Sequence, residues 1–239
     1  MIRRRVGDSY RYFVSNLTPN DVEREVALAA TGCNVSVSLR SGESCFIDAS
    51  ADGSVQVTYP VGIHTHRSSL LTDLTDQPWS LRFIESQPAF DEEITLDGLK
   101  TWEALSVDSL NELMGTGVYE TSFNLSAADV EKGAYQLDLG DVRESARVYI
   151  NGTYIGCAWC VPFTLDFDGL LREGENTIRI EVTNLPANRI AEYDRQGRPW
   201  RKFNEINVVD INYKRTTYAG WTPMPSGLNS YVRIYTLKP

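Results

Sequence analysis

Hydrophobic and polar residues alternate along most of this 239-residue chain with the two-residue period of a β-strand. In the first part of the chain the alternating runs are short and are separated by turn residues: 10–15, 23–29, 33–39, 45–48 and 55–59. Strands of this length and spacing predict a small antiparallel β-sandwich over residues 1–75.

A second unit is predicted over residues 76–239, where the strand pattern continues. Its alternating runs lie at 79–84, 118–125, 135–139, 146–150, 154–158, 163–167, 176–183 and 231–237. Asn151-Gly152 joins two of these runs. This pair predicts a type I′ hairpin turn, because both central residues of such a turn need a positive φ.

Helical periodicity is confined to three short segments, 106–114, 126–132 and 185–193. The strands instead predict an all-β protein of two β-sandwiches. The second has about eight to ten strands, as in a sandwich or jelly roll. A long irregular insertion near residues 185–228 interrupts this second sandwich.

Composition and charge exclude several classes of partner. The chain has 23 Lys and Arg against 32 Asp and Glu, a formal net charge of −9, which opposes binding to nucleic-acid phosphates. No apolar run approaches the roughly 20 residues that span a bilayer. The basic start, Met1 to Arg5, lacks the apolar core of a signal peptide. We therefore expect no nucleic-acid partner, no membrane insertion and no self-export of the chain as given.

Residues 117–190 carry a recognisable series of motifs: Val118–Phe123, Leu137–Val142, Ala146–Gly152, Pro162-Phe163 and Glu181–Asn184. The series resembles the galactose-binding-like jelly roll beside the catalytic barrel in glycoside hydrolase family 2. The segment from Asn184 through Trp221 to Tyr235 is similar to the C-terminal region of family 106, the α-L-rhamnosidase-type enzymes.

This resemblance implies that the chain holds accessory, non-catalytic domains of a glycoside hydrolase. The partners that it implies are a plant or microbial polysaccharide or oligosaccharide and the catalytic barrel of the parent enzyme. It also implies a periplasmic or extracellular location in a polysaccharide-degrading bacterium. The sugar itself is left open.

Glycoside hydrolysis needs two carboxylates about 5–10 Å apart. Acidic residues gather at Asp91 to Glu93, at Asp141 with Glu144, and at Asp166 with Asp168. Adjacent acids in loops are typical of a solvated surface, and the resemblance places the catalytic acids on the absent barrel. We predict no catalytic residue in this chain. A small hydrolase is the alternative, which two facing carboxylates in a cleft would support.

His64 and His66, the only histidines, would need a third ligand such as Asp73 or Asp76 to hold a metal. We predict no metal site and no cofactor. A structural calcium ion is the alternative, because jelly-roll sugar modules often carry one, but the sequence identifies no ligands for it.

The four cysteines are too few for a disulfide scaffold. Cys157 and Cys160 have the spacing of a redox motif, but they follow a predicted hairpin strand instead of opening a helix. We therefore interpret them as structural thiols. Cys33 and Cys45 flank one predicted hairpin, and their disulfide state is left open.

The segment from Ala187 to Met224 is rich in aromatic and arginine residues. Long loops in compact domains tend to be functional. Sugar sites combine an aromatic ring, which stacks on C–H faces, with polar groups for the hydroxyls. The predicted carbohydrate-binding residues are Trp159, Arg189, Trp200 and Trp221.

Three alternatives to this role as an accessory binding domain stay open. The aromatic rings can cover the ends of the sandwich or pack on the missing barrel, since interfaces are also rich in aromatic residues and arginine. The chain can be a free-standing carbohydrate-binding module, or a purely structural interaction domain. A concave, open site would favour sugar binding, and a flat apolar patch would favour a missing partner.

Overall fold

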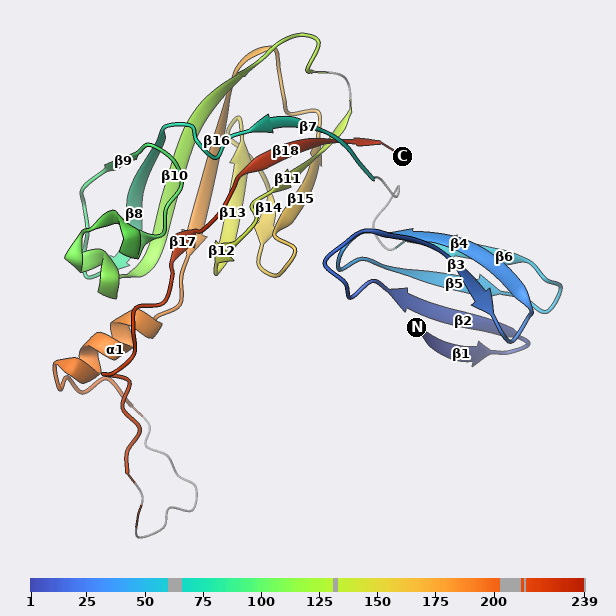
Figure 1. Cartoon of the computed structure of the whole chain (residues 1–239), viewed down its shortest axis with the longest axis horizontal. Helices are drawn as coiled ribbons and strands as arrows, with labels where there is room; N and C mark the ends of the chain where they lie inside the picture. The colour runs from blue at the N-terminus through green and yellow to red at the C-terminus, as the bar shows by residue number, and fades with distance from the viewer. Residues whose placement is uncertain (60–65, 131–132, 203–211, 213, 239) are drawn as a thin grey trace. The chain divides into compact units, whose positions relative to one another are not determined.

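The computed structural model describes residues 1–59, 66–130, 133–202, 212 and 214–238. Within these residues the secondary structure consists of strands, two short 3₁₀-helices and one α-helix, as Figure 1 shows. The predicted all-β class, built of antiparallel sheets, is confirmed. Of the described helices, none is both long and apolar enough to cross a membrane.

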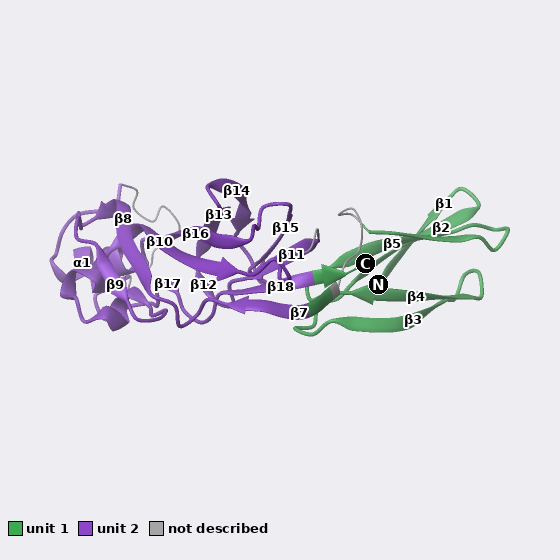
Figure 2. Ribbon diagram, turned by 90° about the horizontal axis from the view of Figure 1, so that it is seen from above, with its two compact units in different colours: residues 1–68, 237–239 green, residues 69–236 purple. Residues whose placement is uncertain are grey.

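The chain divides into two compact units, coloured separately in Figure 2. The first comprises Met1–Ser68 with Leu237–Pro239, and the second comprises Ser69–Thr236. Strand β7 (His66–Asp73) neighbours β18 (Arg233–Lys238) in one sheet. The domain boundary expected between residues 75 and 76 stays a prediction.

The first unit contains one four-stranded and one two-stranded antiparallel sheet. The larger has the order β1 (Ile2–Val6), β2 (Ser9–Ser15), β5 (Ser44–Ala49) and β6 (Val55–Thr58), and the smaller pairs β3 (Val22–Leu28) with β4 (Cys33–Leu39). Alternate residues of β5 point inward, so that Cys45 and Ile47 are buried while Phe46 between them is exposed. Tyr12 and Leu39 belong to the same small core.

The second unit is a larger sandwich. Its six-stranded sheet has the order β14 (Thr153–Ala158), β13 (Ser145–Ile150), β16 (Gly174–Thr183), β10 (Met114–Leu125), β8 (Trp79–Gln87) and β9 (Ile94–Leu96). Its four-stranded sheet has the order β15 (Thr164–Asp168), β11 (Ala134–Asp138), β18 and β7. A short pair joins β12 (Val142–Arg143) to β17 (Gly227–Leu228).

The core of this unit follows from the two-residue period of its strands. In β16, Ile178, Ile180 and Val182 share one face and are all buried, as their spacing predicts. One continuous apolar cluster contains them, together with Trp102 and Tyr119.

The predicted hairpin at Asn151-Gly152 is confirmed. The two residues have φ values of 48° and 79°, and Ile150 pairs with Thr153 across the turn. The Asn151 amide donates hydrogen bonds of 2.8 Å to the Leu170 carbonyl and to the Asn176 side chain. These bonds tie the hairpin to the turn that precedes β16.

Two of the three helical predictions, those at 106–114 and 126–132, need correction. Residues 106–114 contain the end of an irregular stretch and a 3₁₀-helix, η2 (Asp108–Glu112), which follows η1 (Trp102–Leu105). Residues 126–130 form no helix, and 131–132 lie outside the described residues. The reason lies at Ser126, whose backbone and hydroxyl both donate to the Asp129 carboxylate and close a turn in place of a helix.

Candidate functional site

The insertion at residues 185–228 is not wholly irregular, because it begins with the α-helix α1 (Ala187–Arg195), close to the predicted helical segment. The Asn188 side chain, which is buried, clamps the returning chain. Its amide donates to the Met224 carbonyl at 2.9 Å and accepts from the Met224 N–H at 2.7 Å. This pairing fixes where the second half of the insertion passes α1.

Arg189 anchors α1 to the body of the second unit. Its guanidinium is buried, lies 2.6 Å from the Glu112 carboxylate of η2 and sits 4.6 Å from the centre of the Tyr193 ring. An ion pair placed in this way orients the helix. The sugar contact predicted for Arg189 stays a prediction.

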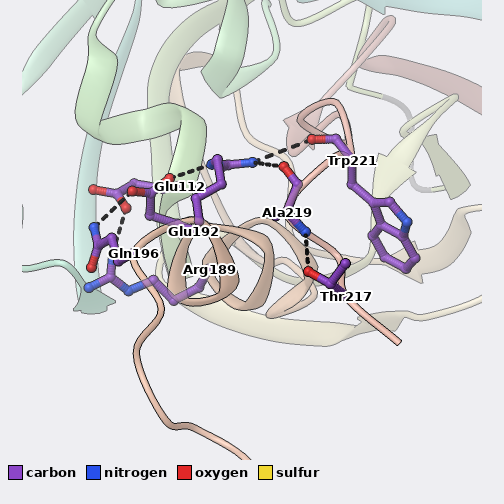
Figure 3. A network of polar contacts seen from close by, with 8 residues as sticks. Glu112, Arg189, Glu192, Gln196, Thr217, Ala219 and Trp221 are labelled. Carbon is purple, nitrogen blue, oxygen red and sulfur yellow. Dashed lines mark hydrogen bonds and ion pairs between the residues drawn. The ribbon is translucent and has the colours of Figure 1, made fainter. Parts of the chain in front are cut away.

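A second network joins the exposed side of α1 to the segment that carries Trp221 (Figure 3). Glu192 accepts hydrogen bonds from Arg195 at 2.6 Å and from Gln196 at 2.8 Å. The bond from Arg195 is the main cause that lowers the pKa of Glu192. Arg195 donates onward to the Ala219 and Trp221 carbonyls, and the Trp221 indole points away from the network.

Asp194 is the polar centre of the insertion. Its carboxylate accepts hydrogen bonds from the Tyr218 N–H at 2.8 Å and from the Trp200 indole at 2.7 Å, and it lies 3.9 Å from the Arg201 guanidinium. The hydrogen bond from Tyr218, then that from Trp200, lowers the pKa of Asp194. The carboxylate is therefore ionised at neutral pH and holds both aromatic residues in place.

Three rings form what we call the aromatic cluster: Trp200, Tyr218 and Trp221. The ring centres of Trp200 and Tyr218 are 6.2 Å apart, and those of Tyr218 and Trp221 are 4.6 Å apart. The Arg201 guanidinium lies 4.8 Å and 5.4 Å from the centres of the Trp200 and Tyr218 rings. At these distances the arginine makes cation–π contacts with both rings.

A cleft of about 500 Å³ opens beside these groups, and we call it the Asp194 cleft. It is lined by Asp194, Gly197, Arg198, Pro199, Trp200, Arg201, Arg215, Thr216 and Thr217. Trp221 lines a separate open hollow of about 400 Å³ with Gly220, Thr222 and Met224. The insertion thus offers a ring, arginine side chains and hydroxyls around one concave space, the composition that ligand sites commonly have.

The structure brings together two of the four predicted binding residues. Trp200 and Trp221 meet through Tyr218. Trp159 follows β14, is 73% exposed and has no ring contact with the aromatic cluster among the described residues. The sequence reasoning passed over Asp194, although its position one helical turn before an arginine- and tryptophan-rich stretch was the signal that marked it.

The other acidic residues considered as catalytic acids either accept hydrogen bonds within the protein or are exposed. Burial opposes the ionisation of Asp141, but hydrogen bonds from Asn229 and Arg143 outweigh it and lower the pKa of Asp141. An acid held ionised in this way does not suit the role of general acid. Asp166 accepts a 2.7 Å bond from Gln136, and residues 91–93 are exposed.

The four cysteines, Cys33, Cys45, Cys157 and Cys160, are free thiols. Burial raises the pKa of the Cys45 thiol, which makes it less reactive. No group of three or more potential metal ligands gathers in the described part of the chain. His64 and the side chain of His66, the predicted metal candidates, lie outside that part.

Comparison with known proteins agrees with this architecture. Residues 112–228 match the family model described as glycosyl hydrolase 2 galactose-binding domain-like. This stretch of the second unit is therefore similar to the galactose-binding-like domains of glycoside hydrolases. The matched stretch runs from the end of η2 through α1 to β17 and includes the Asp194 cleft.

Two relatives are much longer than this chain. A protein of Formosa agariphila with a provisional β-glucuronidase name is 29% identical over 162 residues, covering 61% of this chain and 14% of the relative. A rhamnosidase structure from Novosphingobium sp. PP1Y aligns with a TM-score of 0.63 and 21% identity, covering 98% of this chain and 23% of that one. The second likeness shows a shared fold. This chain spans less than a quarter of the length of each of these two proteins.

Proposed function

We propose that this chain is a non-catalytic accessory region of a glycoside hydrolase and that it binds carbohydrate at the Asp194 cleft. The observation that carries the proposal is the Trp200 ring with Arg201 stacked on it, beside an open cleft of about 500 Å³ in a galactose-binding-like region. The ring matches the apolar face of a sugar, and the arginine and threonine donors match its hydroxyls.

The site is held rigid by contacts that a ligand does not need to form. Asp194 fixes the Trp200 indole edge and the Tyr218 backbone, while Arg201 donates to the Thr216 carbonyl at 2.5 Å. A ring fixed at its edge is already held in one orientation, which lowers the entropic cost of binding. We also propose that the parent enzyme resembles the α-L-rhamnosidase-type enzymes of family 106. The proposal does not name the sugar, which the titration below is designed to identify.

A second role, docking on a catalytic domain of the parent enzyme, is favoured by a different observation. Leu185, Trp221 and Met224 belong to the insertion and are 49%, 49% and 41% exposed. The hollow beside Trp221 is apolar enough to receive a partner side chain. In this arrangement the Asp194 cleft binds sugar and the Trp221 hollow faces the catalytic domain.

Calorimetric titration against rhamnose, galactose and galacturonic acid, and against oligosaccharides of each, tests the proposal. Saturable binding is expected, and Trp200→Ala should abolish it while Tyr154→Ala, an exposed tyrosine on β14, should leave it unchanged. Trp159→Ala and Trp221→Ala test the remaining predicted tryptophans. No turnover of aryl glycosides is expected.

Flat titrations across the whole panel would contradict carbohydrate binding and leave the docking role. Turnover of any aryl glycoside by the purified chain would contradict the non-catalytic role. The two measurements are independent. Sugar binding depends on the aromatic cluster, whereas turnover of an aryl glycoside would depend on carboxylates elsewhere in the chain.

A further inference from the structure

The Asp194 cleft carries an excess of positive charge inside a chain of net charge −9. Among the described residues that line it, three arginines, Arg198, Arg201 and Arg215, stand against one carboxylate, that of Asp194. Clefts lined by one sign of charge concentrate ligands of the opposite sign. The local charge is therefore opposite to that of the molecule as a whole.

The Asp194 carboxylate already has partners within the protein. Asp194 accepts from Trp200 and from the Tyr218 backbone, and its remaining ionic neighbour is Arg201. The Arg201 side chain is only 12% exposed and also donates to the Thr216 carbonyl. Arg201 and Asp194 thus form a compensated, mostly buried pair that belongs to the wall of the cleft.

The other two arginines are not compensated. Arg198 and Arg215 are exposed, and within the described part of the chain no carboxylate lies at ion-pair distance from either guanidinium. Arg198 lies over the Tyr193 ring, 4.9 Å from its centre. Stacking fixes the guanidinium plane and leaves its N–H edge free to pair with a planar anion, as in bidentate recognition of a carboxylate.

We infer that the Asp194 cleft binds an anionic sugar, with Arg198 and Arg215 holding the negative group and Trp200 receiving the sugar ring. This inference rests on the proposed function, because it names the class of carbohydrate that the same cleft takes. A uronic acid carboxylate and a sulfate ester share the chemistry that the two arginines recognise.

The test compares galactose-type sugars that carry a neutral or a negatively charged group at C6. Galacturonic acid, its methyl ester, galactose and galactose 6-sulfate are titrated by calorimetry into the full chain and into the double variant Arg198→Ala/Arg215→Ala. The wild-type chain should bind the acid or the sulfated sugar about tenfold or more tightly than the neutral sugars. Whichever of the two anions binds more tightly shows whether the cleft prefers a carboxylate or a sulfate ester.

The double variant should lose the preference for the anion and keep the affinity for galactose within about twofold, because neither arginine contacts the face of Trp200. Arg147→Ala removes one exposed arginine of β13 and serves as the control for loss of positive charge outside the cleft, which should keep the preference. Circular dichroism and thermal melting check that each variant folds, since exposed arginines contribute little to stability.

The outcomes distinguish a failure of the anionic specificity from a failure of carbohydrate binding as a whole. Equal affinity for galacturonic acid and its methyl ester, with no preference for the sulfate, overturns the anionic specificity and leaves carbohydrate binding standing. A preference that survives in the double variant overturns the assignment to Arg198 and Arg215. Absence of binding by every sugar overturns this inference and the proposed carbohydrate binding together.

Discussion

Two groups of aromatic rings in the second unit are built from the same residue types and are used in opposite ways. In the core, Trp79, Trp102 and Tyr119 are at most 1% exposed. The Trp79 indole donates to the Leu74 carbonyl, and the Trp102 indole donates to the Tyr119 hydroxyl at 2.8 Å. Ring faces and polar edges are both satisfied inside the protein.

In the insertion, the rings are only partly enclosed by protein. The Trp200 indole is held by Asp194, and Trp221 remains 49% exposed. Rings fully surrounded by protein contribute packing energy, whereas partly exposed rings contribute less and keep surface for a ligand or partner. Because indole edges have polar partners in both groups, the exposure of the ring, and not the partner of its edge, distinguishes a core ring from a candidate binding ring.

The largest effect is expected for Trp102→Ala. Removal of a fully buried indole from the centre of the second unit should lower the free energy of unfolding by about 3–5 kcal/mol, through lost burial and a residual cavity. Urea denaturation followed by circular dichroism measures it. A loss of less than about 1 kcal/mol would show that Trp102 does not organise this core.

Tyr119→Phe isolates the polar edge of the same core. It leaves two buried donors without their acceptor, the Trp102 indole and the Leu228 N–H, while it preserves the ring. The expected loss is about 1–3 kcal/mol. Tyr154→Phe, on an exposed tyrosine, is the control and should leave the denaturation midpoint unchanged. Equal midpoints for both variants would argue against a role for the buried hydroxyl.

Acidification tests the edge of the aromatic cluster. Folding lowers the pKa of Asp194 below its ordinary value of 3.8, so its contribution to stability is fully present above that value and is lost as the pH falls through the lower folded value. Fluorescence of the insertion tryptophans should therefore change in acid at about this point. Asp194→Asn removes the charge and should abolish that step in the titration.

The smallest effect on stability is expected for Trp221→Ala. Since this ring is half exposed, its loss should change the free energy of unfolding by only about 0.5 kcal/mol. Thermal melting of this variant beside Trp102→Ala measures the contrast between the two groups of rings directly. Similar melting temperatures for the two variants would contradict the distinction between buried core rings and exposed rings of the insertion.

Much of the fold could be predicted from local patterns. The two-residue period located the strands, as the buried set Ile178, Ile180 and Val182 confirms. The Asn151-Gly152 pair located a hairpin, because positive φ is a property of those two residues themselves. Such predictions succeed because the information lies within a few residues of the feature.

The candidate site was predictable in composition but not in arrangement. Aromatic residues and arginines marked the insertion, and two of the four predicted binding residues, Trp200 and Trp221, do lie in one cluster. Trp159 was grouped with them because of its residue type, although it follows β14 and has no described contact with them. Residue type alone does not show which side chains meet.

The sequence by itself thus determined the all-β class, the hairpin and the segment in which to look for a site. Only the tertiary structure decided that Glu112 would hold Arg189, that Asp194 would hold Tyr218, and that two arginines of the cleft would have no carboxylate at ion-pair distance among the described residues. The reason is physical. Strand and turn preferences act between near neighbours, whereas these ion pairs and hydrogen bonds join residues 24 to 77 positions apart and exist only after the chain has folded.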